Sequence, residues 1–326
     1  MSKIKKIGVF TSGGDAPGMN AAIRAVVRAG IYYKFAIVGI FSGYQGMIKG
    51  KMKKMNVRSV ANIIHRGGTI LQSARSEEFR TRTGRKKAIE KLKKNKIDAL
   101  VAIGGDGTFR GAITLNKEYD IPIIGIPGTI DNDLFGTDAT IGYDTATNTA
   151  VKAIDMIRDT ALSHNRLFFI EVMGRDSGFI AMRSGIAGGA VATIIPEDDI
   201  TLEELVEIIN KGLKSKKSSS LVVVAEGGKL GGALQLAEKV KEKFSYFEPR
   251  VTILGHIQRG GSPTVFDRLL ASRLGVAAIE ALKEGKSNVM AGIKNSKIVF
   301  TPFQKSISTP KIINQEAWRI AKILSS

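Results

Sequence analysis

Short apolar runs that end at glycine-bearing turns recur along this chain of 326 residues. They occupy residues 7–10, 36–41, 100–103, 121–126, 167–172, 221–225 and 250–254. Such runs are typical of strands buried on both faces of a parallel sheet, and the stretches between them predict covering helices. The alternation predicts an α/β fold. Because the glycine-bearing turns form two series, we expect two similar Rossmann-like three-layer domains with largely parallel sheets and an active-site cleft between them.

The composition indicates the cellular compartment of the protein and its relation to membranes. Cysteine is absent, which excludes disulfides and thiolate sites and suits a reducing compartment. No window approaches the roughly 18 uninterrupted apolar residues of a membrane span. The apolar run behind the basic start ends at Thr11, so no export signal is predicted. We expect a soluble, cytoplasmic protein without a membrane partner.

The formal net charge of +19 has three possible explanations: a nucleic-acid surface, an anionic lipid surface, or a site for phosphorylated small molecules. Lysines are spread over predicted helices and loops, and only six tyrosines and one tryptophan could stack on bases. Several arginines instead stand beside glycines at strand ends, where a forked donor suits phosphate. We expect phosphorylated small molecules and no nucleic acid; salt-sensitive binding to duplex DNA would favour the alternative.

Two glycine-rich stretches near the start of the chain are candidate phosphate sites. Residues 13–18 separate the first strand from a helix that carries Arg24 and Arg28 on one face. Glycines let the backbone approach a phosphate, and a helix N-terminus presents free amide hydrogens to it. Residues 67–76 end in Arg75 and Ser76, but Arg75 taken alone is better explained by a surface ion pair.

A stronger candidate is Gly104-Gly105-Asp106-Gly107-Thr108, which lies between the strand at 100–103 and a helix expected from about Phe109. Its glycines would clear space for a nucleotide, and Thr108 could offer a hydroxyl. Asp106 supplies the hard oxygen ligand that Mg²⁺ requires. The stretch is neither a Walker motif nor a dinucleotide fingerprint, because the spacing of each is missing.

The heptapeptide Pro127-Gly128-Thr129-Ile130-Asp131-Asn132-Asp133 follows the strand at 121–126. Ligands of parallel α/β sheets collect at the carboxyl ends of strands. A Pro-Gly turn at such an end can project Thr129 and Asp131 toward a bound molecule. Taken alone, the heptapeptide is equally well explained as a plain turn, which is built from the same residue types.

The second half of the chain repeats the plan of strand, glycine-bearing loop and helix. The strand at 167–172 ends in Met173-Gly174-Arg175, the strand at 221–225 ends in Glu226, and the strand at 250–254 leads into the loop 255–263. That loop holds His256 and Arg259. The histidines of the chain are not spaced as metal ligands, so zinc is not expected. His256 is better explained as a hydrogen-bond donor to a sugar phosphate.

Two helices of this half are also expected. A long one covers residues 144–164. Thr201 and Glu204 form a capping box that starts another, which extends to about Leu213.

Together these stretches closely resemble the bacterial ATP-dependent 6-phosphofructokinase family. The resemblance rests on residues 11–20, 104–107, 127–133, 173–175 and 255–263, in order and with similar spacings over essentially the whole chain. It implies transfer of the ATP γ-phosphoryl group to the 1-hydroxyl of fructose 6-phosphate with Mg²⁺, a committing step of glycolysis. It also implies an allosteric homotetramer with active sites shared between subunits.

The resemblance implies a role for each matching residue. Asp131 would be the general base on the sugar hydroxyl, with Thr129 beside it and Asp133 near the metal and phosphates. The other implied catalytic residues are Gly14, Arg75 and Arg175. The implied ATP site comprises Gly14, Arg75, Ser76, Gly105, Asp106, Gly107 and Thr108, with Asp106 at Mg²⁺. The implied fructose 6-phosphate site comprises Thr129, Ile130, Asp131, Met173, Gly174, Arg175, Glu226, His256, Ile257, Gln258 and Arg259, with Arg166 and Arg250 contributed by a neighbouring subunit.

Two glycines bear on the phosphoryl donor. Pyrophosphate-using relatives typically carry Asp at the position of Gly107 and Lys at that of Gly128, which fill the space of the nucleotide's α-phosphate. Both positions are glycine here. ATP is therefore the expected donor.

The implied effector site departs from the family's pattern. The matching residues are Arg24, Arg28, Arg158, Gly189 and Lys217. Val191 stands where the pattern usually has a Glu that helps bind the effector's metal, and Ser215 stands where it has an Arg. Losing one anion and one cation from a phosphate pocket predicts weak or altered control by ADP and phosphoenolpyruvate.

By resemblance, the ATP-binding domain would comprise residues 1–141 and 256–304, and the fructose 6-phosphate-binding domain residues 142–255 and 305–326. Other kinases with the Gly-Gly-Asp-Gly tetrapeptide, such as NAD kinases and lipid kinases, are alternatives, but they should lack the loop 255–263. A nicotinamide-dependent dehydrogenase fits the fold but has no fingerprint in this sequence.

Overall fold

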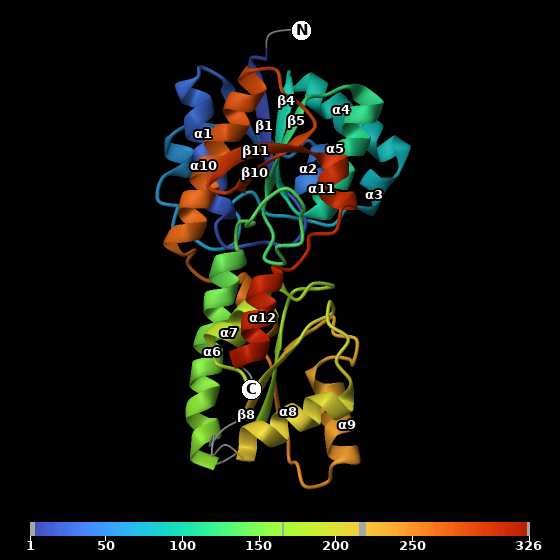
Figure 1. Cartoon of the computed structure of the whole chain (residues 1–326). Helices are drawn as coiled ribbons and strands as arrows, with labels where there is room; N and C mark the ends of the chain where they lie inside the picture. The colour runs from blue at the N-terminus through green and yellow to red at the C-terminus, as the bar shows by residue number, and fades with distance from the viewer. Residues whose placement is uncertain (1–3, 165, 215–219, 325–326) are drawn as a thin grey trace. The chain divides into compact units, whose positions relative to one another are not determined.

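The computed structural model describes residues 4–164, 166–214 and 220–324 and divides into two compact units (Figure 1). Unit 1 comprises Met1–Ile130, Leu134–Thr145 and Arg259–Lys311. Unit 2 comprises Asp131–Asp133, Ala146–Gln258 and Ile312–Ser326. Each unit is built around one sheet. The assignment of ATP to one domain and the sugar phosphate to the other stays a prediction.

Unit 1 contains a sheet of seven strands in the order β11-β10-β5-β4-β1-β2-β3. Its strands are β1 (Lys6–Thr11), β2 (Ala36–Ile40), β3 (Met52–Met55), β4 (Ala99–Gly104), β5 (Ile123–Pro127), β10 (Val289–Lys294) and β11 (Lys297–Pro302). The central pairs are parallel, and only the edge strands β3 and β11 pair antiparallel with their neighbours. β5 begins after Pro122, later than expected, because proline has no amide hydrogen to donate to the ladder.

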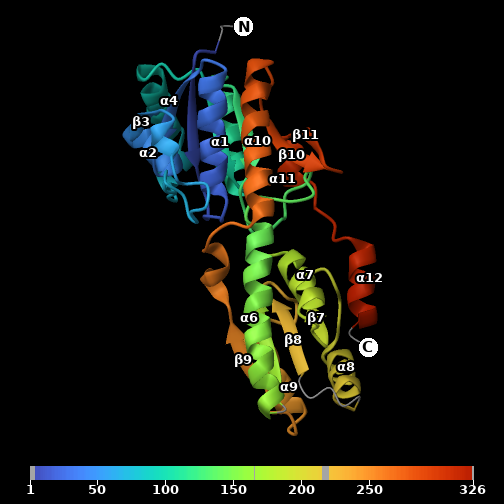
Figure 2. The same cartoon turned by 90° about the vertical axis from the view of Figure 1, so that its left-hand side faces the viewer.

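Helices cover both faces of this sheet. On one face, α1 (Met19–Tyr32) and α10 (Val265–Lys283) lie side by side (Figure 2). The other face carries α2 (Gly43–Lys49), α4 (Arg82–Lys94), α5 (Asp106–Tyr119) and α11 (Phe303–Ser308), and two short helical segments complete the unit: 3₁₀ (Arg58–Val60) and α3 (Glu77–Arg80). Unit 1 is thus a three-layer α/β structure.

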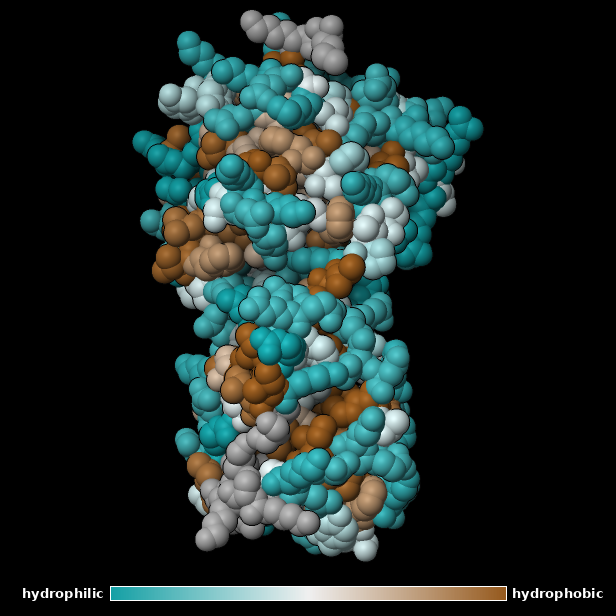
Figure 3. Space-filling view, viewed as in Figure 1, coloured by the Kyte–Doolittle hydropathy of each residue, from teal (hydrophilic) through white to brown (hydrophobic). Residues whose placement is uncertain are grey.

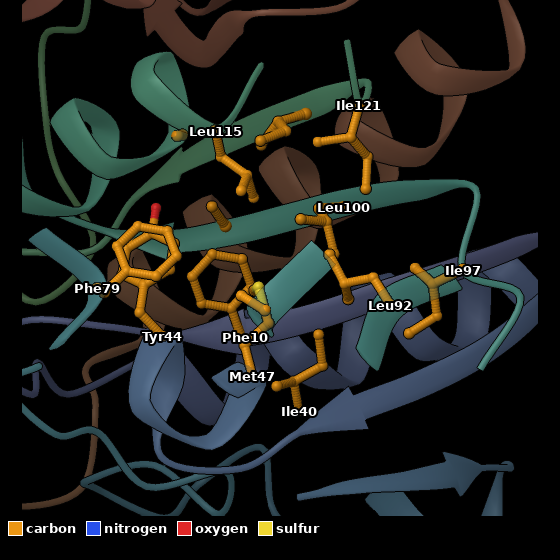
Figure 4. Packing of buried hydrophobic residues seen from close by; sticks show 14 of the residues in the cluster. Phe10, Ile40, Tyr44, Met47, Phe79, Leu92, Ile97, Leu100, Leu115 and Ile121 are labelled. Atoms are coloured by element: carbon orange, nitrogen blue, oxygen red, sulfur yellow. The ribbon is translucent and has the colours of Figure 1, made fainter. Parts of the chain in front are cut away.

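The core under α2, α4 and α5 supports the start of α5. Phe10 and Leu100 from the sheet meet Met47 of α2 and Leu92 of α4 in this core (Figure 4). Tyr44 is buried among these residues, and its hydroxyl donates to the backbone oxygen of Thr108 over 2.6 Å. Burial raises the pKa of the Tyr44 hydroxyl, so it keeps its proton and the bond. The core thereby fixes the first turn of α5.

Unit 2 contains a sheet of four parallel strands in the order β7-β8-β6-β9. Its strands are β6 (Leu167–Val172), β7 (Ala192–Ile194), β8 (Ser220–Ala225) and β9 (Arg250–Ile253). Its helices are α6 (Tyr143–His164, whose first residues belong to unit 1), α7 (Phe179–Ala187), α8 (Leu202–Lys214), α9 (Ala233–Lys243), α12 (Gln315–Leu324) and a 3₁₀ segment (Gly255–Arg259, whose last residue belongs to unit 1). Side chains of α8 and α9 pack on Phe169, Val222 and Val224 of the sheet, while α7 packs against β7, β8 and α12.

The predicted α/β fold with largely parallel sheets is confirmed, and so is the capping box of α8. The amide of Thr201 donates to Oε2 of Glu204 over 2.8 Å, and the amide of Glu204 donates to Oγ1 of Thr201 over 3.2 Å. Among the helices of the described residues, none combines the length and the hydrophobicity needed to cross a lipid bilayer.

Candidate functional site

Three glycine-rich strand ends meet at one edge of the sheet in unit 1. β1, β4 and β5 are adjacent and parallel, with Thr11 opposite Ile103 and Gly104 opposite Pro127. Their carboxyl ends therefore bring together the predicted residues of three separate stretches. An added Cβ on Gly105 would lie 3.6 Å from Cβ of Thr129, which shows how closely two of these stretches approach.

The first turn of α5 forms part of this edge. The helix begins at Asp106, three residues before the expected Phe109, because Gly105 occupies the N-cap position in an extended conformation. The hydroxyl of Thr108 donates to the backbone oxygen of Ser12 over 3.0 Å, and Thr108 is buried. This hydrogen bond ties α5 to the end of β1 and places the positive end of the helix dipole at this edge, where it favours an anion.

Asp106 is the candidate metal ligand of this edge. Its side chain is 35% exposed and lies 3.6 Å from Arg110, one helical turn away. Oδ1 of Asp106 accepts the amide of Gly107 over 2.6 Å. The described residues contain no group of three or more acidic or histidine side chains arranged around a common point. A single carboxylate fits Mg²⁺ that is held mainly by phosphate oxygens, as is usual for nucleotide-bound Mg²⁺.

The loop that carries Arg75 and Ser76 is tied to the same edge at its beginning. Oγ1 of Thr11, the last residue of β1, donates to the backbone oxygen of Gln72 over 2.8 Å. Ser76 caps α3, because its hydroxyl accepts the amide of Phe79 over 3.2 Å. The Arg75 side chain is exposed. It is thus accessible to a ligand, and its role in ATP binding stays a prediction.

Arg259 lies against the first glycine turn of unit 1, which comprises residues 13–18. Nη1 of Arg259 donates to the backbone oxygen of Asp15 over 3.3 Å. An added Cβ on Gly14 would lie 2.5 Å from the same nitrogen. The residue predicted for the sugar phosphate therefore contacts a turn predicted for the nucleotide. Glycine at position 14 is what allows this approach.

In unit 2, predicted sugar-phosphate residues meet at the carboxyl ends of β6, β8 and β9. Oε1 of Glu226 accepts the amide of Arg175 over 2.6 Å and that of Gly174 over 3.3 Å. Oε1 of Gln258 accepts the amide of Met173 over 3.3 Å, and Gln258 is fully buried. Arg175 has a left-handed backbone with φ of 57°, which Glu226 stabilises by accepting its amide. The Arg175 side chain is 61% exposed.

Asp131 is joined to this loop. Its backbone oxygen accepts the hydroxyl of Ser177 over 3.1 Å, and the same hydroxyl donates to the backbone oxygen of Gly174 over 2.9 Å. Asp131 is buried, and its neighbour Ile130 is fully buried. On the 3₁₀ segment that follows β9, His256 and Ile257 are exposed. Unit 2 thus places the predicted base beside predicted sugar-phosphate residues.

Two predicted substrate residues lie elsewhere. Arg166 directly precedes β6, and Arg250 is the first residue of β9, paired with Phe168. Both arginines are exposed at the amino ends of strands whose carboxyl ends carry the other sugar-phosphate residues. A strand of six residues spans about 20 Å. Within unit 2, these arginines are therefore separated from the predicted residues at the carboxyl ends of β6, β8 and β9.

The structure brings together two of the predicted effector residues. The guanidinium of Arg158 on α6 donates to the backbone oxygens of Gly188 and Gly189 just after α7. Val191 is buried in the core of unit 2, and an added Cβ on Gly212 would lie 2.5 Å from its Cγ2. On α1, Arg24 is half-buried and Arg28 is exposed. The remaining positions of this prediction, Lys217 and Ser215, lie outside the described residues.

Sequence reasoning missed a buried carboxylate in unit 1, Asp267. It accepts three hydrogen bonds from residues at the start of α6. Thr264 and Asp267 match the Thr-x-x-Asp pattern of a helix start, which could have pointed to α10. That pattern carries no information about the partner on α6.

The parallel sheets, the glycine-rich strand ends beside a helix N-terminus and the carboxylates near them define an α/β phosphotransferase. Comparison with known proteins narrows this class. The chain belongs to the phosphofructokinase family, whose model matches residues 6–282.

Similar proteins agree with this membership. The chain is 54% identical over 325 residues to ATP-dependent 6-phosphofructokinase 2 of Bacteroides thetaiotaomicron, covering 100% of both chains. It is 56% identical over 322 residues to ATP-dependent 6-phosphofructokinase 1 of Thermus thermophilus, covering 99% of this chain and 100% of that protein. Phosphofructokinase of Pichia pastoris, solved in the T-state, matches 99% of the chain with a TM-score of 0.87 and 37% identity. The chain spans only 37% of that yeast protein's length.

Proposed function

We propose that this chain transfers the γ-phosphoryl group of ATP to the 1-hydroxyl of fructose 6-phosphate, which yields fructose 1,6-bisphosphate and ADP in glycolysis. The observation that carries the proposal is the meeting of the β1, β4 and β5 ends at one edge, with the α5 N-terminus and Asp106 among them. Relatives named ATP-dependent 6-phosphofructokinase, 54% and 56% identical over their whole length, support it.

Phosphoryl transfer depends on alignment and charge neutralisation rather than on covalent chemistry by the protein. In this proposal the ATP phosphates bind at the N-terminus of α5 and at Gly14, and Arg75 and Arg175 neutralise the charge on the transferred group. Asp106 would hold Mg²⁺, which screens the phosphate oxygens when it is bound. Asp131 accepts the proton of the 1-hydroxyl as the sugar oxygen bonds to the γ-phosphorus and the bond to ADP breaks.

The test pairs product identification with removal of the proposed base. Purified protein given ATP, Mg²⁺ and fructose 6-phosphate should form fructose 1,6-bisphosphate and ADP in equal amounts. Asp131→Ala should lower kcat by on the order of 10²–10⁴, the range typical of losing a general base. Its affinity for ATP, measured by calorimetry, should stay close to that of the unaltered chain. Asp120→Asn, at the far end of α5, is the matched control.

An Asp131→Ala variant with unchanged kcat would contradict the role of Asp131. Absence of any product from the unaltered chain would contradict the proposed reaction itself.

We also propose a homotetramer in which Arg166 and Arg250 serve a neighbouring subunit. Their position at the amino ends of β6 and β9 supports this, because it separates them from the sugar-phosphate residues at the carboxyl ends of the same sheet. An apolar surface lies over the beginning of α10 (Figure 3), where Val265 and Leu269 are 72% and 61% exposed. Such a surface suits a contact between chains.

Mixing two inactive variants tests the shared site. Asp131→Ala retains Arg250, and Arg250→Ala retains Asp131, so a hybrid oligomer would contain some complete sites. Each variant alone should have low activity at limiting fructose 6-phosphate, and mixing under conditions of subunit exchange should restore part of it. Hybrids verified with two affinity tags that show no recovery would contradict the sharing of sites.

Weak or altered effector control is part of the proposal. The position of Val191 supports it, because this side chain packs in the core against α8 and offers no carboxylate to an effector-bound metal. Strongly sigmoidal saturation by fructose 6-phosphate that ADP relieves would contradict it. A cytoplasmic location stays a prediction.

A further inference from the structure

Asp267 is a fully buried carboxylate that the proposed reaction does not use. It lies in the first turn of α10, where Thr264 caps the helix by accepting the amide of Asp267 over 3.3 Å. Its Oδ1 accepts the amide of Gly142 over 2.9 Å. Its Oδ2 accepts the amide of Thr145 over 2.8 Å and the hydroxyl of Thr145 over 2.5 Å. Three donors thus converge on one carboxylate away from water.

Further hydrogen bonds join the same two helix starts. The amide of Thr264 donates to Oγ1 of Thr145 over 3.0 Å. The hydroxyl of Thr264 donates to Oδ2 of Asp144 over 2.8 Å. These side-chain and backbone hydrogen bonds therefore connect the first turn of α6 to the first turn of α10, and all of them lie within unit 1. Removing one member of such a set leaves buried donors without an acceptor.

Residues 140–145, which are bound to Asp267, are also bound to the turn that precedes Asp131. The amide of Ile141 donates to the backbone oxygen of Pro127 over 2.9 Å. The hydroxyl of Thr140 donates to the backbone oxygen of Thr129 over 2.6 Å, and Thr140 is fully buried. Residues 140–145 thus lie between Asp267 on one side and the Thr129 turn on the other.

Close packing makes this connection stiff. Gly142 has a φ of 101°, and an added Cβ there would lie 2.7 Å from Cβ of Ala16 and 3.3 Å from Cγ2 of Ile130. An added Cβ on Gly18 would lie 3.5 Å from Cβ of Asp267. The Asp267 cluster therefore packs against the first glycine turn as well as against Ile130. Packed interiors transmit small displacements because they contain few voids.

We propose that Asp267 is a positioning residue for phosphoryl transfer: as a carboxylate it fixes residues 140–145, which in turn hold the Thr129 turn that leads into Asp131. The inference rests on the proposed roles of Thr129 and Asp131. Alignment is central to phosphoryl transfer, and a misplacement of about 1 Å can lower a rate by about 10².

The charge on Asp267 gives the proposal a pH signature. The pKa of Asp267 is raised to about 6, chiefly by burial and less by the nearby Asp144 carboxylate, while the bonds from Thr145 and Gly142 oppose the shift. From α6, the ionisable group that faces Asp267 is Asp144. The glycine turn at residues 13–18 contributes Gly18, which carries no charge. On α10 itself, the Arg268 side chain donates to the backbone oxygen of Pro263. Protonation below about pH 6 leaves fewer acceptor sites for three donors.

The test compares kcat, both KM values and the pH profile across five chains: the unaltered one and four variants. Asp267→Asn keeps the shape but presents an amide group to the donors of Thr145, so kcat should fall by about 10- to 100-fold with small changes in either KM. Thr140→Val removes only the bond to Thr129 and should lower kcat less. Asp98→Asn is the control, because Asp98 also accepts two backbone amides, those of Lys5 and Lys6, and stands at the opposite end of β4. It should keep the kcat of the unaltered chain.

The unaltered chain should lose kcat as the pH falls through about 6, and Asp267→Asn should lack this limb because its side chain cannot titrate. An Asp267→Asn variant with unaltered kcat and an unaltered acid limb would overturn the proposal. So would a Thr140→Val variant whose kcat is unaltered. An Asp131→Asn chain in the same series separates the two proposals: its retention of activity would contradict the role of Asp131, whatever Asp267→Asn does.

Discussion

Gly104 and Gly107 stand three residues apart in one motif but are glycine for different reasons. An added Cβ on Gly104 would collide with the side chain of Thr108 and with the backbone oxygen of Ser12. An added Cβ on Gly107 would meet nothing within 4 Å, and Gly107 is exposed. Packing therefore requires glycine at position 104 and leaves position 107 open. A bound nucleotide would explain the small residue there.

Gly107→Asp tests this explanation at the level of one residue. Because the site is open, the free energy of unfolding should change by no more than about 0.5 kcal/mol. The added carboxylate would occupy nucleotide space and repel phosphate, so kcat/KM for ATP should fall by at least about 10-fold. Steady-state kinetics and denaturant titration measure the two effects. An unchanged kcat/KM for ATP would contradict the proposed position of the nucleotide.

The buried carboxylate of Asp267 predicts a pH dependence of stability. Its pKa is about 6 in the folded chain and, in the unfolded chain, returns to the ordinary value of 3.8. The folded state therefore holds the proton more tightly, so the contribution of Asp267 to the free energy of unfolding decreases as the pH rises from about 4 to about 6. Asp267→Asn should lack this decrease. Parallel unfolding curves for both chains across that range would be inconsistent with the raised pKa.

At the scale of elements, the sequence predicted the ends of helices and strands correctly where those ends depend on residues close together in the chain. Strand β6 was predicted at its observed ends, and the Thr201–Glu204 pair correctly predicted the start of α8. The start of α5 was wrong because Gly105 can adopt the N-cap conformation. Parallel strand order allowed us to expect that the Gly104 and Pro127 stretches would meet. The contact between Arg259 and Asp15 could not be expected, because it joins residues 244 positions apart.

Thr201→Ala tests the contribution of the α8 cap. Loss of an N-cap hydroxyl lowers stability by about 1 kcal/mol. The pKa of Glu204 lies below its usual value, first because the Thr201 amide donates to the carboxylate and next because the Thr201 hydroxyl does. The bonds that the Glu204 carboxylate accepts therefore support the helix start at neutral pH and are lost as the pH falls through the lowered pKa. Thermal unfolding should show a lower Tm at pH 7 with kcat unchanged, and an equal Tm would contradict this.

At the scale of the whole molecule, the order and spacing of the motifs predicted the phosphofructokinase family, and the family model and full-length relatives confirm it. A sequence pattern describes one chain and contains no direct information on surfaces that meet another copy. For that reason the tetramer, the role of Arg166 and Arg250, and the effector response stay predictions.

The most direct test of the central claim compares two phosphoryl donors in parallel reactions that contain fructose 6-phosphate and Mg²⁺. One reaction receives ATP and the other pyrophosphate, and fructose 1,6-bisphosphate is measured in both. We expect product with ATP alone, because the open space at Gly107 leaves room for the nucleotide. Product with pyrophosphate alone, or no product with either donor, would contradict the account.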